Sequence, residues 1–273
     1  SNFGYSTDEV PTGALWSPRL GFNYALCPNN TEQVRGGLGL FSGRTPYVWL
    51  SNQFGNTGNE FRRLQVVFNA NNRNVPFVTD INAQPTNLGN IPANEIDLIA
   101  PDYSFPSLMR GNLAYDRELG FFGLVGTAEF LYTKNVHDIK YQNLNLVQIG
   151  VRPDGRPQYA RNRVPTLSDV IFLTNTDVGS AWSLAFKVDR PFRNRFFMNA
   201  SYLYGESKSI MDGTSSQAAS NFINVYRTGD VNNPPESRSN FDPGHRVTIS
   251  GGYDIPVGAG YTVTASIFYS GQS

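Results

Sequence analysis

The feature that most restricts the fold is a long hairpin of alternating residues within His245–Ser270. In both arms, apolar or aromatic side chains occupy every second position, and mostly small or polar ones lie between them. Such alternation predicts β-strands, because successive side chains of a strand point to opposite faces. Tyrosines stand at the ends of the apolar set, at Tyr253, Tyr261 and Tyr269. Rings at both ends of an apolar face are typical of the aromatic girdles of transmembrane β-barrels.

The same alternation recurs along the chain and predicts eight strands. They lie near residues 16–25, 33–41, 108–117, 122–133, 180–190, 196–204, 245–254 and 261–270. Short connections within each pair of strands alternate with three long ones, at 42–107, 134–179 and 205–244. Outer-membrane barrels show this asymmetry, because their periplasmic turns are tight and their extracellular loops are long. We therefore expect the three long connections to face the outside of the cell.

The first long connection has no regular alternation. A short helix is expected near Tyr47 to Phe54, whereas Phe61 to Phe68 fits either a strand or a helical turn.

The strands of a soluble β-sandwich also alternate, so the period alone does not identify the environment. The apolar sets contain almost only aliphatic residues, aromatic residues and glycine, and the charged side chains fall in the opposite sets. A small soluble barrel would keep its charges outside and fill its interior with the apolar set. Here the polar sets are mainly small or neutral, as in a wet lumen or a surface packed on a plug. We therefore favour an all-β fold, a sector of an antiparallel transmembrane β-barrel, over the sandwich.

Composition excludes several other classes of protein. Lys plus Arg and Asp plus Glu each number 22, and the pI is near 6.7, which argues against a nucleic-acid surface. Cys27 is the single cysteine, so neither an internal disulfide nor a multi-cysteine metal site is expected. No apolar run reaches the length of about 18 residues that marks a membrane helix. We expect no cofactor and no metal.

Several strand and loop pieces are similar to one family. Ser17–Asn23 and Arg35–Arg44 resemble the barrel of Oar-like TonB-dependent receptors. The further matching pieces are Pro46–Asn52, Gly123–Glu129, Tyr202–Lys208 and Phe241–Val247. The resemblance runs from about residue 14 to the end of the chain. It implies an outer-membrane barrel of about 22 strands, which in this family follows a carboxypeptidase-regulatory-like domain and a plug.

We expect this chain to be a part of such a barrel. No TonB box or plug is readable, Ser1–Tyr5 has no signal-peptide character, and Tyr269–Ser273 lacks the terminal aromatic residue of these barrels. The inward sets are also too small to fill a closed eight-strand barrel, with Gly37 and Ser201 as examples. We therefore predict an open, curved sheet whose first and last strands are not paired to each other.

The resemblance implies an active transporter, which binds its ligand at extracellular loops and admits it when the TonB complex pulls on the plug. Its partners would be outer-membrane lipid, the plug, the TonB complex and an extracellular ligand. A surface adhesin or structural barrel without transport is one alternative, and an outer-membrane enzyme is another. No catalytic residue is expected, because His137 beside Asp138 and His245 after Asp242 lack the further partners that catalysis needs.

Two groups of residues are candidates for binding. Tyr47 and Trp49 are candidate ligand contacts, because aromatic rings beside amide side chains suit stacking on glycans or peptides. The alternative is that these rings fold the loop onto a small core of its own. Five charged residues on the predicted lumen face either line a substrate path or pair with the plug, and we favour the plug. They are Arg35, Arg110, Glu129, Lys187 and Arg246.

Overall fold

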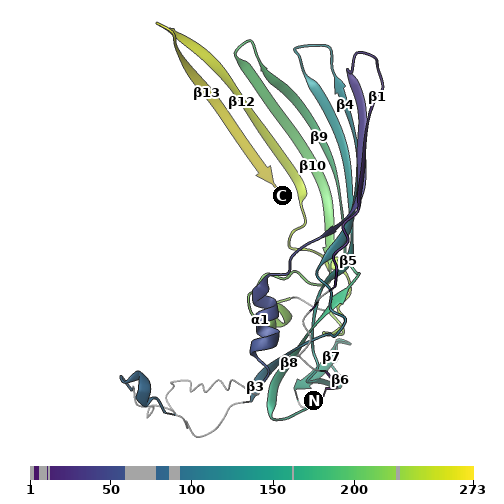
Figure 1. Ribbon diagram of the computed structural model, residues 1–273, viewed down its shortest axis with the longest axis vertical. Helices are drawn as coiled ribbons and strands as arrows, with labels where there is room; N and C mark the ends of the chain where they lie inside the picture. Colours follow the sequence, from purple (N-terminus) through teal and green to yellow (C-terminus); the bar gives the residue numbers. More distant parts are fainter. Residues whose placement is uncertain are drawn as a thin grey trace.

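The structure is a computed structural model, and it describes residues 3–5, 11, 13–58, 78–85, 93–161, 163–225 and 228–273. The stretch Phe61 to Phe68, for which the sequence allowed a strand or a helical turn, lies outside the described residues. Figure 1 shows two parts, a tall curved sheet and a smaller body at one end of it.

The tall sheet, which we call the wall, contains eight strands. They are β1 (Arg19–Ala25), β2 (Glu32–Ser42), β4 (Ser107–Glu118), β5 (Val125–Asn143), β9 (Ser180–Arg193), β10 (Phe196–Ser209), β12 (Gly244–Gly258) and β13 (Tyr261–Gln272). Each strand pairs antiparallel with the next one in this order. The eight strands that alternation predicts are therefore all present, and β5 continues past its predicted end at 133 to Asn143.

The cross-strand register places apolar side chains beside apolar ones and polar side chains beside polar ones across the wall. Ala200 lies between Val188 and Ile249, and its neighbour Ser201 lies beside Thr248. Because paired residues share a face, apolar rows form one side of the wall and polar rows form the other. We call these sides the apolar face and the polar face. No described residue covers the apolar face, and Ile249 is 42% exposed.

The wall is an open sheet. Strands β1 and β13 are its two edges and are not paired to each other, which confirms the prediction (Figure 1). Edge strands of this kind carry backbone N–H and C=O groups that a further strand can pair with.

The connections differ between the two ends of the wall. Short turns lie at one end and the three long connections lie at the other, as predicted (Figure 1). The long connections contain α1 (Tyr47–Gly55), η1 (Ile81–Ala83), β3 (Asn94–Ile99), β6 (Leu146–Val151), β7 (Pro157–Arg161), β8 (Leu167–Thr176), α2 (Ala218–Ile223) and β11 (Ser237–Arg238). Helix α1 confirms the helix expected near Tyr47 to Phe54, and the sequence did not predict the other elements. No helix in the described part of the chain is long and apolar enough to cross a membrane.

The smaller body, which we call the cap, is built by all three long connections. It comprises α1, β3, β8, α2 and the Asp138–Asn143 end of β5. Strand β8 pairs in parallel with β3 and antiparallel with this end of β5. Ile99, Tyr141 and Ile171 from the three strands are at most 1% exposed, and Phe222 of α2 joins them. The three long connections therefore share one hydrophobic core.

Candidate functional site

The polar face of β2, β4 and β5 carries a set of charged and amide side chains. Register places Gln33 beside Asp116, and it places Ala114 between Arg35 and Glu129. Because Ala114 is small, the long side chain of Arg35 can reach the carboxylates of both neighbouring strands. Ala114 itself is only 1% exposed. The alternating pattern of three strands thus gathers acids and a base at one place.

Asp116 is the centre of the resulting hydrogen-bond network. Its Oδ2 accepts from Arg35 Nε at 2.9 Å and from Gln33 Nε2 at 3.0 Å. Its Oδ1 accepts from the hydroxyl of Thr127 at 2.6 Å. The second carboxylate, Glu129, lies 3.7 Å from Arg35 Nη2. Charged hydrogen bonds of this kind hold their side chains in place, so this half of the polar face is a fixed lining.

The other half of the polar face, on β9, β10 and β12, has fewer internal partners. A hollow of about 630 Å³ extends over both halves. Lys187 Nζ lies 3.4 Å from Asp189 Oδ1, whereas Arg246 forms no ion pair with any residue that the structure describes. This side of the hollow therefore offers cationic groups to an occupant.

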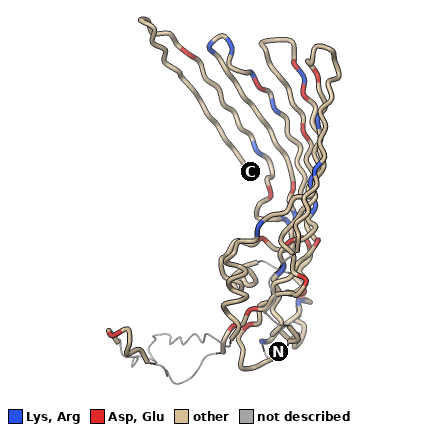
Figure 2. Tube along the Cα trace, viewed as in Figure 1, with Lys and Arg blue, Asp and Glu red and all other residues tan. Residues whose placement is uncertain are grey.

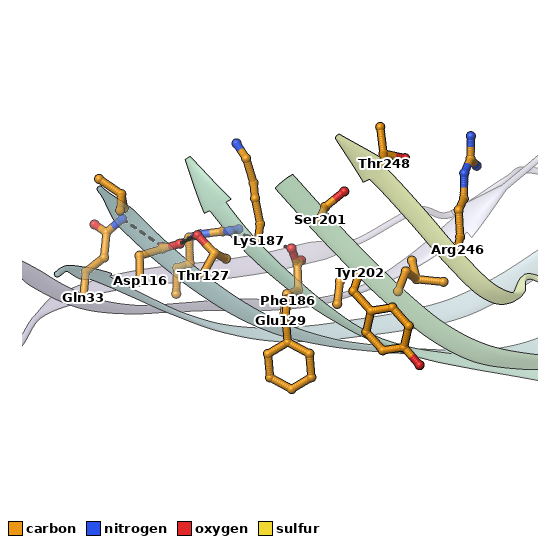
Figure 3. A pocket seen from close by; sticks show the side chains of 14 residues that line it. Gln33, Asp116, Thr127, Glu129, Phe186, Lys187, Ser201, Tyr202, Arg246 and Thr248 are labelled. Atoms are coloured by element: carbon orange, nitrogen blue, oxygen red, sulfur yellow. Dashed lines mark hydrogen bonds and ion pairs between the residues drawn. The ribbon is translucent and has the colours of Figure 1, made fainter. Parts of the chain in front are cut away.

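Figure 3 separates the two faces directly. Lys187, Ser201 and Thr248 project to one side of the sheet, whereas Phe186 and Tyr202 project to the other. The lining of the hollow includes apolar residues such as Val125 and Leu203, and its amides, hydroxyls and charges can bind by hydrogen bonds and ion pairs. Among the described residues there is also no group of three or more His, Cys, Asp or Glu that could hold a metal ion.

The structure brings four of the five predicted lumen residues to this hollow, namely Arg35, Glu129, Lys187 and Arg246. Arg110 lies apart from them. Its Nε donates to the hydroxyl of Thr133 at 3.2 Å, and it lines a separate hollow of about 220 Å³. The central position of Asp116 was not predicted, although alternation placed this residue in a polar set.

A third hollow, of about 370 Å³, lies where the wall meets the cap. Its lining includes Arg44, Trp49, Asp138 and Asp212. Asp212 accepts hydrogen bonds from two serine hydroxyls and a backbone N–H, so its charge is well compensated. Burial, and less strongly the charge of Asp212, raises the pKa of Asp138. Arg44 forms no ion pair with any described residue, so this hollow presents charges of both signs.

The two candidate ligand-binding aromatics have different surroundings. Tyr47 begins α1 and is 69% exposed, whereas Trp49 is 9% exposed and belongs to the cap core. Trp49 Nε1 donates to the carbonyl of Ser215 at 2.6 Å. Trp49 also lines the hollow between wall and cap, and Tyr47 is absent from that lining. For Trp49 the structure therefore largely favours the alternative interpretation, in which the ring belongs to a small core onto which the loop folds.

Both histidines are held by neighbouring hydroxyl groups. His137 Nδ1 lies 2.9 Å from the hydroxyl of Ser107, and His245 Nδ1 lies 2.7 Å from that of Tyr202. Asp242 accepts from the backbone N–H of Ser207 and from an arginine instead of from His245. His245 thus lies on the apolar face beside an aromatic ring.

The family model described as "Outer membrane beta barrel domain" matches residues 9–270. The siderophore receptor PirA from Pseudomonas aeruginosa is 11% identical, with a TM-score of 0.42 over 94% of this chain and 34% of that chain. The outer membrane transporter YddB from Escherichia coli is 12% identical, with a TM-score of 0.45 over 87% of this chain and 26% of that chain. No curated protein matches. The chain spans about a third or less of the length of these two structures.

Proposed function

The chain belongs to the family of outer membrane β-barrel domains, and from that membership we propose that it forms part of the wall of an active transporter. In this proposal the polar face lines a lumen that a plug closes. A ligand binds at the cap and is admitted when the TonB complex pulls on the plug. The resemblance of the strand and loop pieces to Oar-like receptors supports this choice. The barrel itself performs no chemistry.

Membership in the family confirms the predicted barrel fold and outer-membrane location. The apolar face of the wall therefore faces lipid. On β9 this face runs from Trp182 to Val188, between Ser180 near the cap and Arg190 near the turns. The segment from Ser180 to Arg190 measures about 34 Å along the strand, or about 24 Å across a bilayer at a tilt of about 45°. That thickness agrees with the apolar band of about 25 Å on outer-membrane barrels.

The observation that carries the proposal is the division of the polar face. On β2, β4 and β5 the charges are satisfied internally by the Asp116 network. On β9 and β12 the hollow presents Lys187, which is paired with Asp189, and Arg246, which forms no ion pair with any described residue. A fixed lining suits a closed path, and available cations suit ionic contact with a plug. A wall built only to anchor loops in the membrane has no need of either.

The ligand in this proposal meets the outer hollow between wall and cap. Arg44 and the edge of Trp49 lie in its lining together with Asp138. A cation, an aromatic ring and a carboxyl group can contact a peptide or a glycan by ionic, stacking and hydrogen-bonding contacts. We therefore expect an extracellular ligand of one of these two classes.

Cysteine labelling in living cells tests transport. The full-length protein would carry Cys27→Ser with Ser201→Cys on the polar face, and a water-soluble maleimide would be added from outside. If the TonB complex moves the plug, labelling of residue 201 is several-fold faster with the proton-motive force intact than after a protonophore. The rate of labelling is the measured quantity.

Ala200→Cys in the same background is the matched control, since it lies one residue away on the lipid side. It should label slowly in both conditions. Slow labelling of residue 201 that ignores the protonophore would indicate an adhesin or structural barrel. Fast labelling that ignores it would indicate a permanently open pore, and either result contradicts the proposal.

A further inference from the structure

We propose that the turn between β9 and β10 carries a binding site for the phosphate of an anionic phospholipid, with Arg190 and Arg193 as its ligands. The site lies on the apolar face at the end of the wall away from the cap. The inference rests on the membrane location of the wall and is independent of transport. It concerns lipid of the leaflet that meets the short turns.

A β-bulge places both arginines on the same face. Arg190 pairs with Met198, and Arg193 pairs with Phe196 after a shift of register between these two pairs. The arginines are three positions apart in the sequence, so plain alternation would send them to opposite faces. The extra residue of the bulge on β9 turns the second arginine to the apolar side. Phe196 itself belongs to the apolar face, because it pairs with Tyr253 on β12.

An aromatic ring positions the first guanidinium. Arg190 Cζ lies 5.0 Å from the centroid of the Phe196 ring, within the range of a cation–π contact. Phe192, next to this turn, is 59% exposed, and Phe122, on the turn between β4 and β5, is 75% exposed. Exposed rings at the end of an apolar face lie at the headgroup level of a bilayer. The arginine stems can then follow apolar surface while their charged ends meet the headgroups.

The arginines have no acidic partner in the described part of the chain. Neither Arg190, Arg193 nor the adjacent Arg195 forms an ion pair there. Arg190 Nε is also buried without a hydrogen-bond partner. Asp189, the nearest acid in sequence, is on the polar face, where Asn199 donates to it at 2.8 Å.

Another arginine on the apolar face has a different arrangement. Arg117 Nε lies 3.2 Å from Glu32 Oε1, so its charge is compensated within the protein. Figure 2 shows the blue of Lys and Arg gathered at the turn between β9 and β10. Unpaired guanidinium groups bind phosphate by charged, two-pronged hydrogen bonds. Their position at the lipid boundary selects a phosphate that belongs to a lipid.

Native mass spectrometry of the purified full-length protein tests the site. Binding of phosphatidylglycerol and of phosphatidylcholine would be titrated for the wild type and for Arg190→Gln/Arg193→Gln. A basic residue near the membrane contributes enough that losing one should weaken phosphatidylglycerol binding about fivefold, and losing both about 25-fold. Phosphatidylcholine binding should change little. The Arg190→Lys/Arg193→Lys variant keeps the charge and should retain part of the preference.

Arg152→Gln, in the turn between β6 and β7 and far from the turn between β9 and β10, is the matched control and should leave lipid binding unchanged. Heat-modifiable migration on a gel would verify that each variant is folded. Equal binding of phosphatidylglycerol by folded wild type and double variant would overturn the site. Displacement of the lipid by millimolar inorganic phosphate would show a free-phosphate site and would also overturn the assignment. A result here leaves the labelling test of transport unaffected, because no plug motion is measured.

Discussion

Trp49 and Tyr141 meet edge to face, with ring centroids 6.5 Å apart, although they belong to different long connections. The indole of Trp49 also donates its N–H to the carbonyl of Ser215, in the third long connection. The side chain of Trp49, which belongs to the first long connection, therefore contacts the other two long connections. Because the core that it joins is shared, we expect the cap to open as one cooperative unit and not loop by loop.

Removing this indole should open the cap selectively. Trp49→Ala should destabilise the cap by about 3–5 kcal/mol, as large-to-small changes in a packed core do. Tyr47→Ala, two residues earlier but exposed, should change stability by less than about 0.5 kcal/mol. Hydrogen exchange of β3 and β8 would measure the effect. Equal exchange in the two variants would contradict the shared core.

Cap stability should fall as pH rises from about 4 to about 8. Burial, and next the charge of Glu95, raises the pKa of Asp97 from 3.8 to about 8. The folded cap then binds a proton that the unfolded chain has lost, so the stabilisation is complete below about pH 4 and is lost as pH rises through the folded pKa. The measured quantity is the slope of the unfolding free energy of the cap against pH. Denaturant unfolding followed by Trp49 fluorescence, with Trp16 and Trp182 replaced by Phe, gives this slope.

Asp97→Asn should flatten the slope between pH 4 and pH 8. Asp154→Asn is the control, because the hydrogen bond from Arg156 lowers the pKa of Asp154. The contribution of Asp154 to stability is therefore present above the ordinary pKa of an aspartate. It is lost only as pH falls through the lowered pKa of the folded state. A slope that persists in Asp97→Asn would assign the effect to another group.

A charge on the lipid side of the wall should be far less tolerated than one on the polar face. Ile249→Lys should destabilise the folded barrel by about 2–4 kcal/mol if the residue lies near the bilayer midplane. Ser250→Lys, its neighbour on the polar face, should cost much less. Folding free energies in lipid vesicles would compare the two. Similar losses would place residue 249 away from the midplane.

Close approach between strands should make Gly36 irreplaceable. A Cβ atom there would lie 2.8 Å from the backbone oxygen of Asn112 and 2.8 Å from the Phe22 ring. Gly36→Ala should therefore destabilise the wall by about 1–3 kcal/mol through overpacking. At Gly21 the nearest atom is at 3.6 Å, so Gly21→Ala should be tolerated. Folding yield in vesicles reports both, and equal yields would refute the steric argument.

The wall was predictable because its information is local in the sequence. Alternation within ten residues sets the face of each side chain, and a short turn then sets the register of its partner. The two faces around Ala200 and Ser201 follow from this rule alone. The same rule assigns four of the predicted charged residues to one hollow. The Asp116 network needed one more fact, namely which strands are neighbours across the long connections.

The cap was not predictable by the same reasoning. Strand β3 pairs in parallel with β8, so that Ile99 lies beside Leu173, a residue of another long connection. Consecutive residues of these strands are buried, at Asp97–Ile99 and Asp169–Leu173, so the strands lack the alternation of half-exposed strands. The burial of Trp49 likewise depends on Ser215 and Tyr141, which are distant in the sequence. The bulge that turns Arg193 to the apolar side is also invisible to a regular period.

Strand β5 belongs to both bodies of the molecule. Its Val125–Lys134 part pairs with β9 in the wall, and its Asp138–Asn143 part pairs with β8 in the cap. This continuous strand runs from the wall into the cap. A tilt of its wall part by about 5° would displace the far end of the strand, roughly 30 Å beyond the end of the wall, by about 2–3 Å. In the proposed transporter, mechanical load on the polar face of the wall would thus displace the cap.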